Sequence, residues 1–119
     1  MFDNAQQTQF ENRLRTFSKK TRDFINTVQY SIANKEYLKQ VIRSSSSVAA
    51  NYIEACESLT KKEFRHRIMI SKKEAKETAF WLDLIEVNSE NKNREKEWLI
   101  DEATQFVKIF SKTIKNTKI

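Results

Sequence analysis

The stretch that decides the fold runs from Arg43 to Ile85 and reads RSSSSVAANYIEACESLTKKEFRHRIMISKKEAKETAFWLDLI. It contains neither glycine nor proline, and neither residue occurs anywhere in the 119-residue chain. Soluble domains usually carry glycine at about 7% and proline at about 5%, and these residues mark turns, strands and helix ends. Their absence removes the usual turn chemistry of all-β and α/β proteins. It favours an all-α fold whose turns are built on asparagine and serine.

The first half of this stretch belongs to a predicted helix over residues 34–57. Asn34 is its expected N-cap, and Glu36 lies in the first turn, where the helix dipole favours a carboxylate. Ser44–Ser47 lie in its middle, and a loop at the serines is the alternative interpretation. We favour one continuous helix because the apolar stripe continues in phase across them. The stripe comprises Leu38, Val41, Ile42, Ser45, Val48, Ala49, Tyr52, Ile53 and Cys56.

The second half belongs to a predicted helix over residues 60–87. Thr60 and Glu63 have the spacing of a capping box, in which the hydroxyl bonds the third amide and the glutamate reaches back. The inner stripe comprises Phe64, Ile68, Ser71, Ala75, Thr78, Ala79, Leu82 and Ile85. Small residues in the middle of both helices predict a narrow waist where neighbouring helices approach closely.

Two further helices flank this pair, over residues 8–32 and 93–116. The stripe of the first comprises Phe10, Leu14, Phe17, Thr21, Phe24 and Val28, and that of the second Leu99, Ala103, Phe106, Ile109, Phe110, Thr113 and Ile114. The connections are short, which makes consecutive helices antiparallel neighbours. The sequence therefore predicts a single domain over residues 1–119, an all-α, up-down-up-down antiparallel four-helix bundle with short loops.

The charge, hydropathy and cysteine content of the chain indicate the cellular compartment of the protein. The chain carries 22 Lys and Arg against 16 Asp and Glu, and Lys112, Lys115 and Lys118 near its end have no acidic counterweight. It has no run of about 18 apolar residues for a membrane span and no apolar signal-peptide core. Cys56 is the only cysteine, so no intrachain disulfide can form. We expect a cytoplasmic protein with no membrane partner, in which Cys56 is a small buried residue.

Five polar residues of the two central helices form the first candidate site. Asn51 and Glu54 are spaced three apart, as are Glu74 and Glu77, so each pair can share a helix face. With Arg43 they could make one polar network between helices, serving structure or assembly. A catalytic or ligand-binding role is the alternative, since paired carboxylates can act as acid and base.

A second candidate site is a basic stripe on the predicted helix 60–87. Lys61, Arg65, Lys72 and Lys76 fall on one side of the helix, and their spacing could follow a phosphate backbone. Glu63, Glu74 and Glu77 alternate with these cations and could pair with them. A solvated, ion-paired face is therefore the alternative to nucleic-acid contact.

Candidates for catalysis or metal binding are weak. Glu63 and His66 match the Glu-x-x-His spacing of di-iron bundles, but such a site needs two of these motifs and the chain has one histidine. Nothing supplies a nucleophile with a base or a phosphate-binding loop. We therefore expect no catalytic residues, no metal and no cofactor, and a protein that is not an enzyme.

Three segments match a known family in order and spacing. They are Arg43-Ser-Ser-Ser-Ser-Val-Ala-Ala-Asn-Tyr-Ile-Glu54, Glu63-Phe64 at the start of a helix, and Lys73-Glu-Ala-Lys-Glu-Thr-Ala-Phe-Trp-Leu82. On these residues the chain resembles the bacterial four-helix-bundle proteins encoded by intervening sequences in 23S rRNA genes. The resemblance covers about residues 10–115. It implies a bundle that can assemble into a homopentamer, and kinship with the accessory proteins of diversity-generating retroelements, which bind a reverse transcriptase and nucleic acid.

Two functional hypotheses follow. The first is a non-enzymatic, oligomeric accessory protein that binds RNA, DNA or a nucleic-acid enzyme on its basic surface, so that neutralising Lys61, Arg65, Lys72 and Lys76 weakens binding. The second is a structural or protein-interaction bundle without a nucleic-acid role, in which Arg43, Asn51, Glu54, Glu74 and Glu77 serve assembly.

Overall fold

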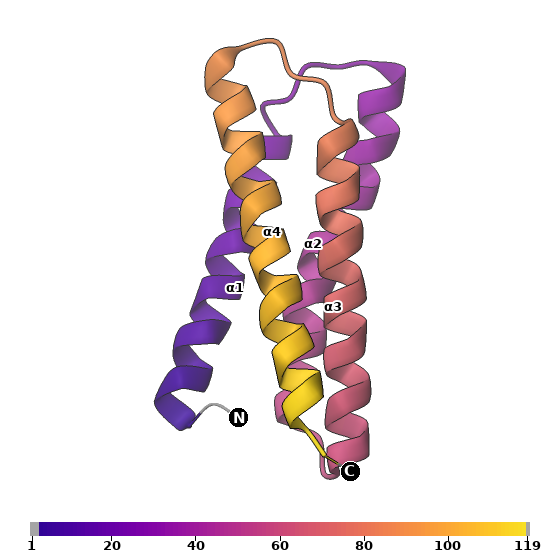
Figure 1. Ribbon diagram of the computed structural model, residues 1–119. Helices are drawn as coiled ribbons and strands as arrows, with labels where there is room; N and C mark the ends of the chain where they lie inside the picture. The colour runs from indigo at the N-terminus through magenta and orange to yellow at the C-terminus, as the bar shows by residue number, and fades with distance from the viewer. Residues whose placement is uncertain (1–2, 119) are drawn as a thin grey trace.

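The computed structural model describes residues 3–118 and shows an antiparallel bundle of four helices (Figure 1). The helices are α1 (Asn4–Ile25), α2 (Ile32–Cys56), α3 (Lys61–Leu84) and α4 (Glu90–Asn116). The described residues contain no strand, and they form a rod of 46 × 24 × 19 Å. The predicted all-α, up-down-up-down four-helix fold is confirmed.

Each helix packs against its two neighbours in a ring in the order α1, α2, α3, α4. The α2/α3 pair makes the most extensive contact and the α1/α4 pair the least. Toward its N-terminal end α1 leans away from the end of α4 (Figure 1), and a hollow of about 680 Å³ lies between them, lined by residues that include Phe10 and Ile109. The α1/α4 seam is therefore the most open side of the bundle.

The core is built from the predicted apolar stripes. Edge-to-face ring contacts join α1 to α4, with Phe17 and Phe106 centroids 5.2 Å apart and Phe10 and Phe110 centroids 5.7 Å apart. The α2 stripe is less complete than predicted, because Ile42 is 41% exposed and Ile53 is 37% exposed. The buried apolar residues are Phe10, Leu14, Phe17, Phe24, Val41, Val48, Tyr52, Ala55, Ile68, Ala75, Leu82, Ile85, Leu99, Ala103, Phe106 and Phe110.

The boundary between α1 and α2 differs from the prediction. The first helix ends at Ile25 rather than residue 32, and α2 is capped by Ser31, whose hydroxyl accepts a bond from the amide of Asn34. Asn34 is therefore not the N-cap. Its buried side chain donates to the carbonyls of Gln29 and Glu86 and accepts from the amide of Glu86 at 3.0 Å. Asn34 thus ties the α1–α2 loop to the α3–α4 loop.

The serine run is helical throughout, which confirms the continuous helix. Ser44 and Ser45 are buried, and the hydroxyl of Thr78 on α3 donates to that of Ser44 at 2.8 Å. Ser71 on α3 donates to the backbone carbonyl of Val48 on α2 at 3.0 Å. Because buried hydroxyls are costly unless they are hydrogen-bonded, these cross-helix bonds explain how α2 and α3 can pack closely on polar side chains.

The starts of the last two helices follow cap chemistry with two corrections. Thr60 accepts from the amide of Glu63 as predicted, but the Glu63 carboxylate reaches the amide of Leu59, so the reciprocal half of the capping box is replaced. The fourth helix begins at Glu90 rather than residue 93, because the Ser89 hydroxyl accepts from the amide of Lys92 and caps it. The third helix ends at Leu84 instead of residue 87.

Candidate functional site

The polar residues of α2 and α3 form a three-membered charge cluster around Arg43. Its guanidinium lies 3.2 Å from the nearer carboxylate oxygen of Glu74 and 3.3 Å from that of Glu77. The Glu74 side chain is only 9% exposed, whereas that of Arg43 is 49% exposed. The cluster therefore links α2 to α3 at the surface while holding one carboxylate nearly out of water.

The other two residues of the predicted network do not join this cluster. Asn51 accepts a bond from Arg67 of α3 at 3.2 Å and donates to the carbonyl of Ser47. Glu54 is exposed, and among residues 3–118 its carboxylate pairs with neither group. The five residues thus divide into two separate α2/α3 contacts and one exposed carboxylate. Sequence reasoning missed Arg67, although the antiparallel register set by the α2–α3 turn places it opposite Asn51.

None of the four cations of the predicted basic stripe is ion-paired to a carboxylate within residues 3–118. Lys61 and Lys76 are exposed, and Arg65 and Lys72 are half-buried. Glu74 and Glu77 pair with Arg43, and Glu63 is engaged at the helix cap. Within residues 3–118, no carboxylate forms an ion pair with any of these four cations, so the stripe keeps its full positive charge.

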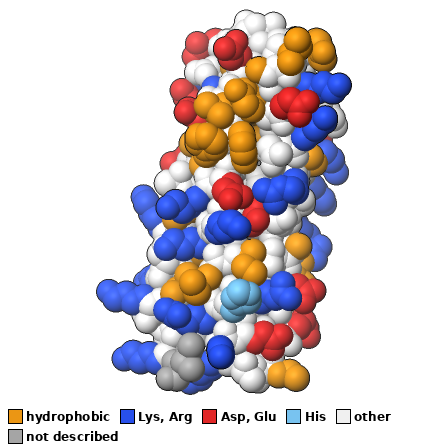
Figure 2. Space-filling model, turned by 90° about the vertical axis from the view of Figure 1, so that its right-hand side faces the viewer, with side chains coloured by type: hydrophobic (Ala, Val, Ile, Leu, Met, Phe, Trp, Pro, Cys, Tyr) orange, Lys and Arg blue, Asp and Glu red, His pale blue; other side chains and the backbone are white. Residues whose placement is uncertain are grey.

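Packing of α3 against α4 enlarges this stripe into a wider surface. Lys72, Lys73 and Lys76 line a hollow of about 420 Å³ together with Met69 and Glu77 of α3 and Ile114 of α4. Residues 103–116 of the adjoining α4 contain three lysines and no carboxylate. Figure 2 shows Lys and Arg side chains gathered along the lower left of the α3 face. We call the following residues the basic surface: Lys61, Lys62, Arg65, Lys72, Lys73, Lys76, Lys108, Lys112 and Lys115. Lys112 lies at its edge, where it also lines the hollow between α1 and α4.

The comparisons with known proteins give the family and the fold of this chain. A family model described as 23S rRNA-intervening sequence protein matches residues 6–112, which include nearly all of the four helices. The chain belongs to the 23S rRNA-intervening sequence protein family. No match was found among the curated proteins.

A solved structure supports the fold of this chain. It is a protein of unknown function from the S23 ribosomal protein family of Bacteroides thetaiotaomicron. The two chains superpose with a TM-score of 0.74 at 24% sequence identity, over 89% of this chain and 98% of the other. At this identity the likeness concerns the fold alone. The segments that carried the family resemblance lie in α2 and α3, where Arg43, Asn51, Glu74 and Glu77 make the contacts described above.

The described residues offer little for metal or thiol chemistry. Among residues 3–118, no group of three or more His, Cys, Asp or Glu side chains could hold a metal ion, and His66 is exposed. Cys56 is half-buried, and burial raises the pKa of its thiol, so the neutral thiol predominates near pH 7. Among the same residues, no helix has the length and apolar character needed to cross a membrane.

The α1/α4 seam holds a polar contact that sequence reasoning missed. Arg13 donates two bonds to the Glu102 carboxylate, at 2.9 and 2.7 Å, and its guanidinium carbon lies 5.2 Å from the ring centroid of Phe106. Hydrogen bonding to Glu102 raises the pKa of Arg13 above its ordinary value. The two residues are 89 positions apart, so no local pattern in the sequence could indicate the pair.

Proposed function

We propose that this protein is a non-enzymatic, oligomeric accessory protein of the bacterial cytoplasm that binds RNA or DNA through its basic surface. One observation carries the proposal. None of the nine cations of the basic surface is ion-paired to a carboxylate within residues 3–118. Unpaired Lys and Arg side chains can replace the counterions condensed on a nucleic-acid backbone, and release of those counterions drives binding.

The geometry of the basic surface supports backbone contact more than base readout. Its cations lie on two antiparallel helices and flank a shallow hollow whose apolar members are Met69 and Ile114. The Phe80 and Trp81 rings pack edge-to-face on each other and Trp81 packs on Tyr37, and both rings lie at the edge of the basic surface, in a hollow that includes Lys76. Binding on this surface should therefore depend strongly on salt and little on nucleotide sequence.

Neutralising the centre of the basic surface tests the proposal. The triple variant Lys72→Gln, Lys73→Gln, Lys76→Gln should weaken binding by about 100-fold at physiological salt and reduce the slope of log K against log salt by about 2–3. The reason is the loss of about three phosphate contacts. Fluorescence anisotropy with labelled single-stranded and duplex RNA and DNA, over about 50–200 mM salt, measures both quantities.

A matched variant removes the same charge elsewhere. Lys19→Gln, Lys35→Gln and Lys39→Gln change three exposed lysines of α1 and α2, and this variant should bind nearly as well as the unmodified protein. An equal loss in both triple variants would show that only net charge matters. Absence of binding to every probe at low salt would remove the nucleic-acid function.

A second candidate function, side-by-side self-assembly, is favoured by the distribution of charge along the bundle. Residues 44–60, level with the basic surface, carry Glu54 and Glu57 and no cation. Toward the other end, residues 83–102 carry seven carboxylates against three cations, while α2 presents Lys35 and also Lys39, which pairs with Glu36 of its own helix at 3.5 Å. Copies with parallel axes would bring opposite charges together at both ends, in a contact that can close into a ring. The family resemblance suggests five copies.

Charge reversal on α2 tests this assembly. Glu54→Lys together with Glu57→Lys should shift the solution mass toward that of the 14.1 kDa protomer, because the neighbour's basic surface would then face like charge. Light scattering after size exclusion measures the mass, and circular dichroism confirms the helix content. The Glu54→Gln, Glu57→Gln pair, which removes charge without reversing it, should retain more of the assembly. A monomeric unmodified protein would rule assembly out.

A further inference from the structure

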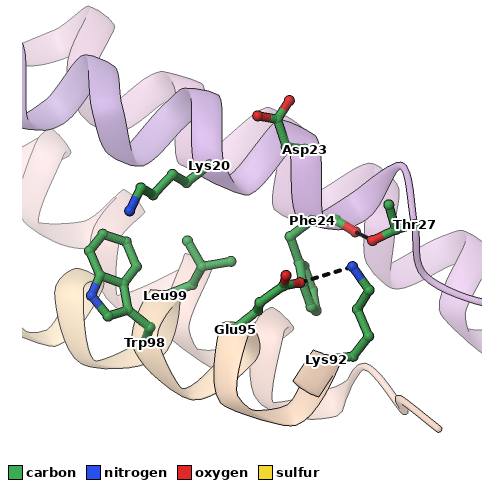
Figure 3. A pocket seen from close by; sticks show the side chains of 8 residues that line it. All are labelled: Lys20, Asp23, Phe24, Thr27, Lys92, Glu95, Trp98 and Leu99. Carbon is green, nitrogen blue, oxygen red and sulfur yellow. Dashed lines mark hydrogen bonds and ion pairs between the residues drawn. The ribbon is translucent and has the colours of Figure 1, made fainter. Parts of the chain in front are cut away.

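A second hollow lies between α1 and α4, at the end of the bundle where α1 meets its loop (Figure 3). Its volume is about 420 Å³, within the range of small-molecule sites. Its apolar lining includes Phe24 and Leu99, which are 3% and 2% exposed, whereas Trp98 at the same hollow is 44% exposed. The hollow therefore combines a buried apolar lining with an accessible aromatic ring.

One cation in this hollow has no carboxylate partner. The ammonium of Lys20 lies 4.4 Å from the centroid of the Trp98 ring. Glu95 is occupied by Lys92 at 3.0 Å, and Asp23 pairs with Arg22 at 3.1 Å and points away from Trp98 in Figure 3. Within residues 3–118 no carboxylate forms an ion pair with Lys20, so its charge is held beside the indole face and remains available to an anion.

We propose that this hollow binds a nucleotide, with the base stacked on Trp98 and the phosphate paired with Lys20. An indole face stacks any nucleobase, because every base has a π-face. The flexible side chain of Lys20 can leave the ring as the base enters and then pair with the attached phosphate. A base bearing a phosphate is presented equally by a free nucleotide and by an unpaired residue of an RNA or DNA strand.

This inference rests on the proposed nucleic-acid function but concerns a different face of the bundle. The basic surface lies on α3 and α4, whereas Lys20 and Trp98 face each other across the α1/α4 seam. A strand held on the basic surface by its phosphates would gain from this hollow a stacking contact that duplexes cannot use. The substrate class is therefore a nucleotide with an accessible base, either free or within a single strand.

Tryptophan fluorescence tests the site directly, because the chain has only two tryptophans. In a Trp81→Phe variant, AMP and a single-stranded oligoadenylate should each quench Trp98 emission to saturation, and ribose 5-phosphate should not. Lys20→Gln in that background should weaken AMP binding by about tenfold, the loss of one charge-assisted contact. Lys19→Gln, which changes an exposed lysine of α1 outside the hollow, should leave it unchanged. In Trp98→Phe, which retains Trp81, neither nucleotide should quench.

The outcomes separate this inference from the proposed function. Unchanged Trp98 emission with millimolar AMP and with the oligonucleotide overturns the nucleotide site, as does equal quenching by ribose 5-phosphate. If the oligonucleotide binds the basic surface while Trp98 emission stays constant, only this inference fails. If AMP quenches Trp98 while no strand binds at low salt, the hollow is a free-nucleotide site and the proposed function fails. Circular dichroism of each variant confirms that the bundle is folded.

Discussion

Replacing Phe106 with alanine is expected to lower the free energy of unfolding by about 3–5 kcal/mol. The Phe106 side chain is fully buried, and its ring packs edge-to-face on Phe17 at 5.2 Å and on Phe10 at 5.8 Å. Its removal would leave a cavity at the seam where α1 and α4 make their least extensive contact. Urea unfolding measures the loss, and the circular dichroism of the helical amides at about 222 nm follows the unfolding.

Phe80 provides the matched control for this substitution. It is also a phenylalanine on a helix, but it is 55% exposed. Phe80→Ala should cost less than about 1 kcal/mol because little apolar area returns to water and no cavity forms. Similar losses for the two variants would mean that the α1/α4 ring contacts do not hold the core together.

Replacing Asn34 with alanine is expected to lower the free energy of unfolding by about 2–3 kcal/mol. The substitution removes three hydrogen bonds to the two loops at one end of the bundle, to the carbonyls of Gln29 and Glu86 and from the amide of Glu86. Asn34 is 1% exposed, so the groups left behind would be partly shielded from water. Urea unfolding again measures the effect, and hydrogen exchange of the Glu86 amide should accelerate.

The control for Asn34 is Asn88→Ala, which changes an exposed asparagine in the α3–α4 loop and should alter stability by less than about 0.5 kcal/mol. Ser31→Ala separates the effect of the α2 N-cap from that of the Asn34 link between the loops. It should lower the free energy of unfolding by about 1 kcal/mol without accelerating hydrogen exchange of the Glu86 amide. If Asn34→Ala costs no more than Asn88→Ala, the link between the two loops contributes nothing to stability.

Much of the fold could be predicted because its determinants are local. Phe10, Leu14, Phe17 and Phe24 recur at helical spacing, and all four are buried. The predicted helix through the serines is confirmed because the apolar phase across Val41 and Val48 outweighs the modest helix propensity of serine. Helix ends were predicted less well. Ser31 and Asn34 are both good N-caps, and the sequence does not reveal that Ser31 caps α2 while the Asn34 side chain bonds the α3–α4 loop.

The candidate sites were predicted only in part. Arg43, Glu74 and Glu77 form one cluster in the structure, but Asn51 pairs with Arg67. Arg67 lies in the middle of a basic segment and carried no distinguishing signal in the sequence. The same limit applies to the basic surface. Its α3 stripe follows from helical spacing, whereas its extension across Lys108 and Lys112 depends on which face of α4 meets α3.

The sequence by itself determined four amphipathic helices, their buried faces and the excess of positive charge, because helical periodicity and capping depend on residues within a few positions of one another. Only the tertiary structure decided which residues from different helices and loops pair with one another. It joined Asn34 to Glu86, 52 residues away, and paired Arg43 with Glu74, 31 residues away. It also left the lysines of α3 without an ion-paired carboxylate among the described residues. It also set Lys20 against Trp98. Such pairs depend on the register and rotation of one helix against another, which side-chain packing over the whole bundle determines.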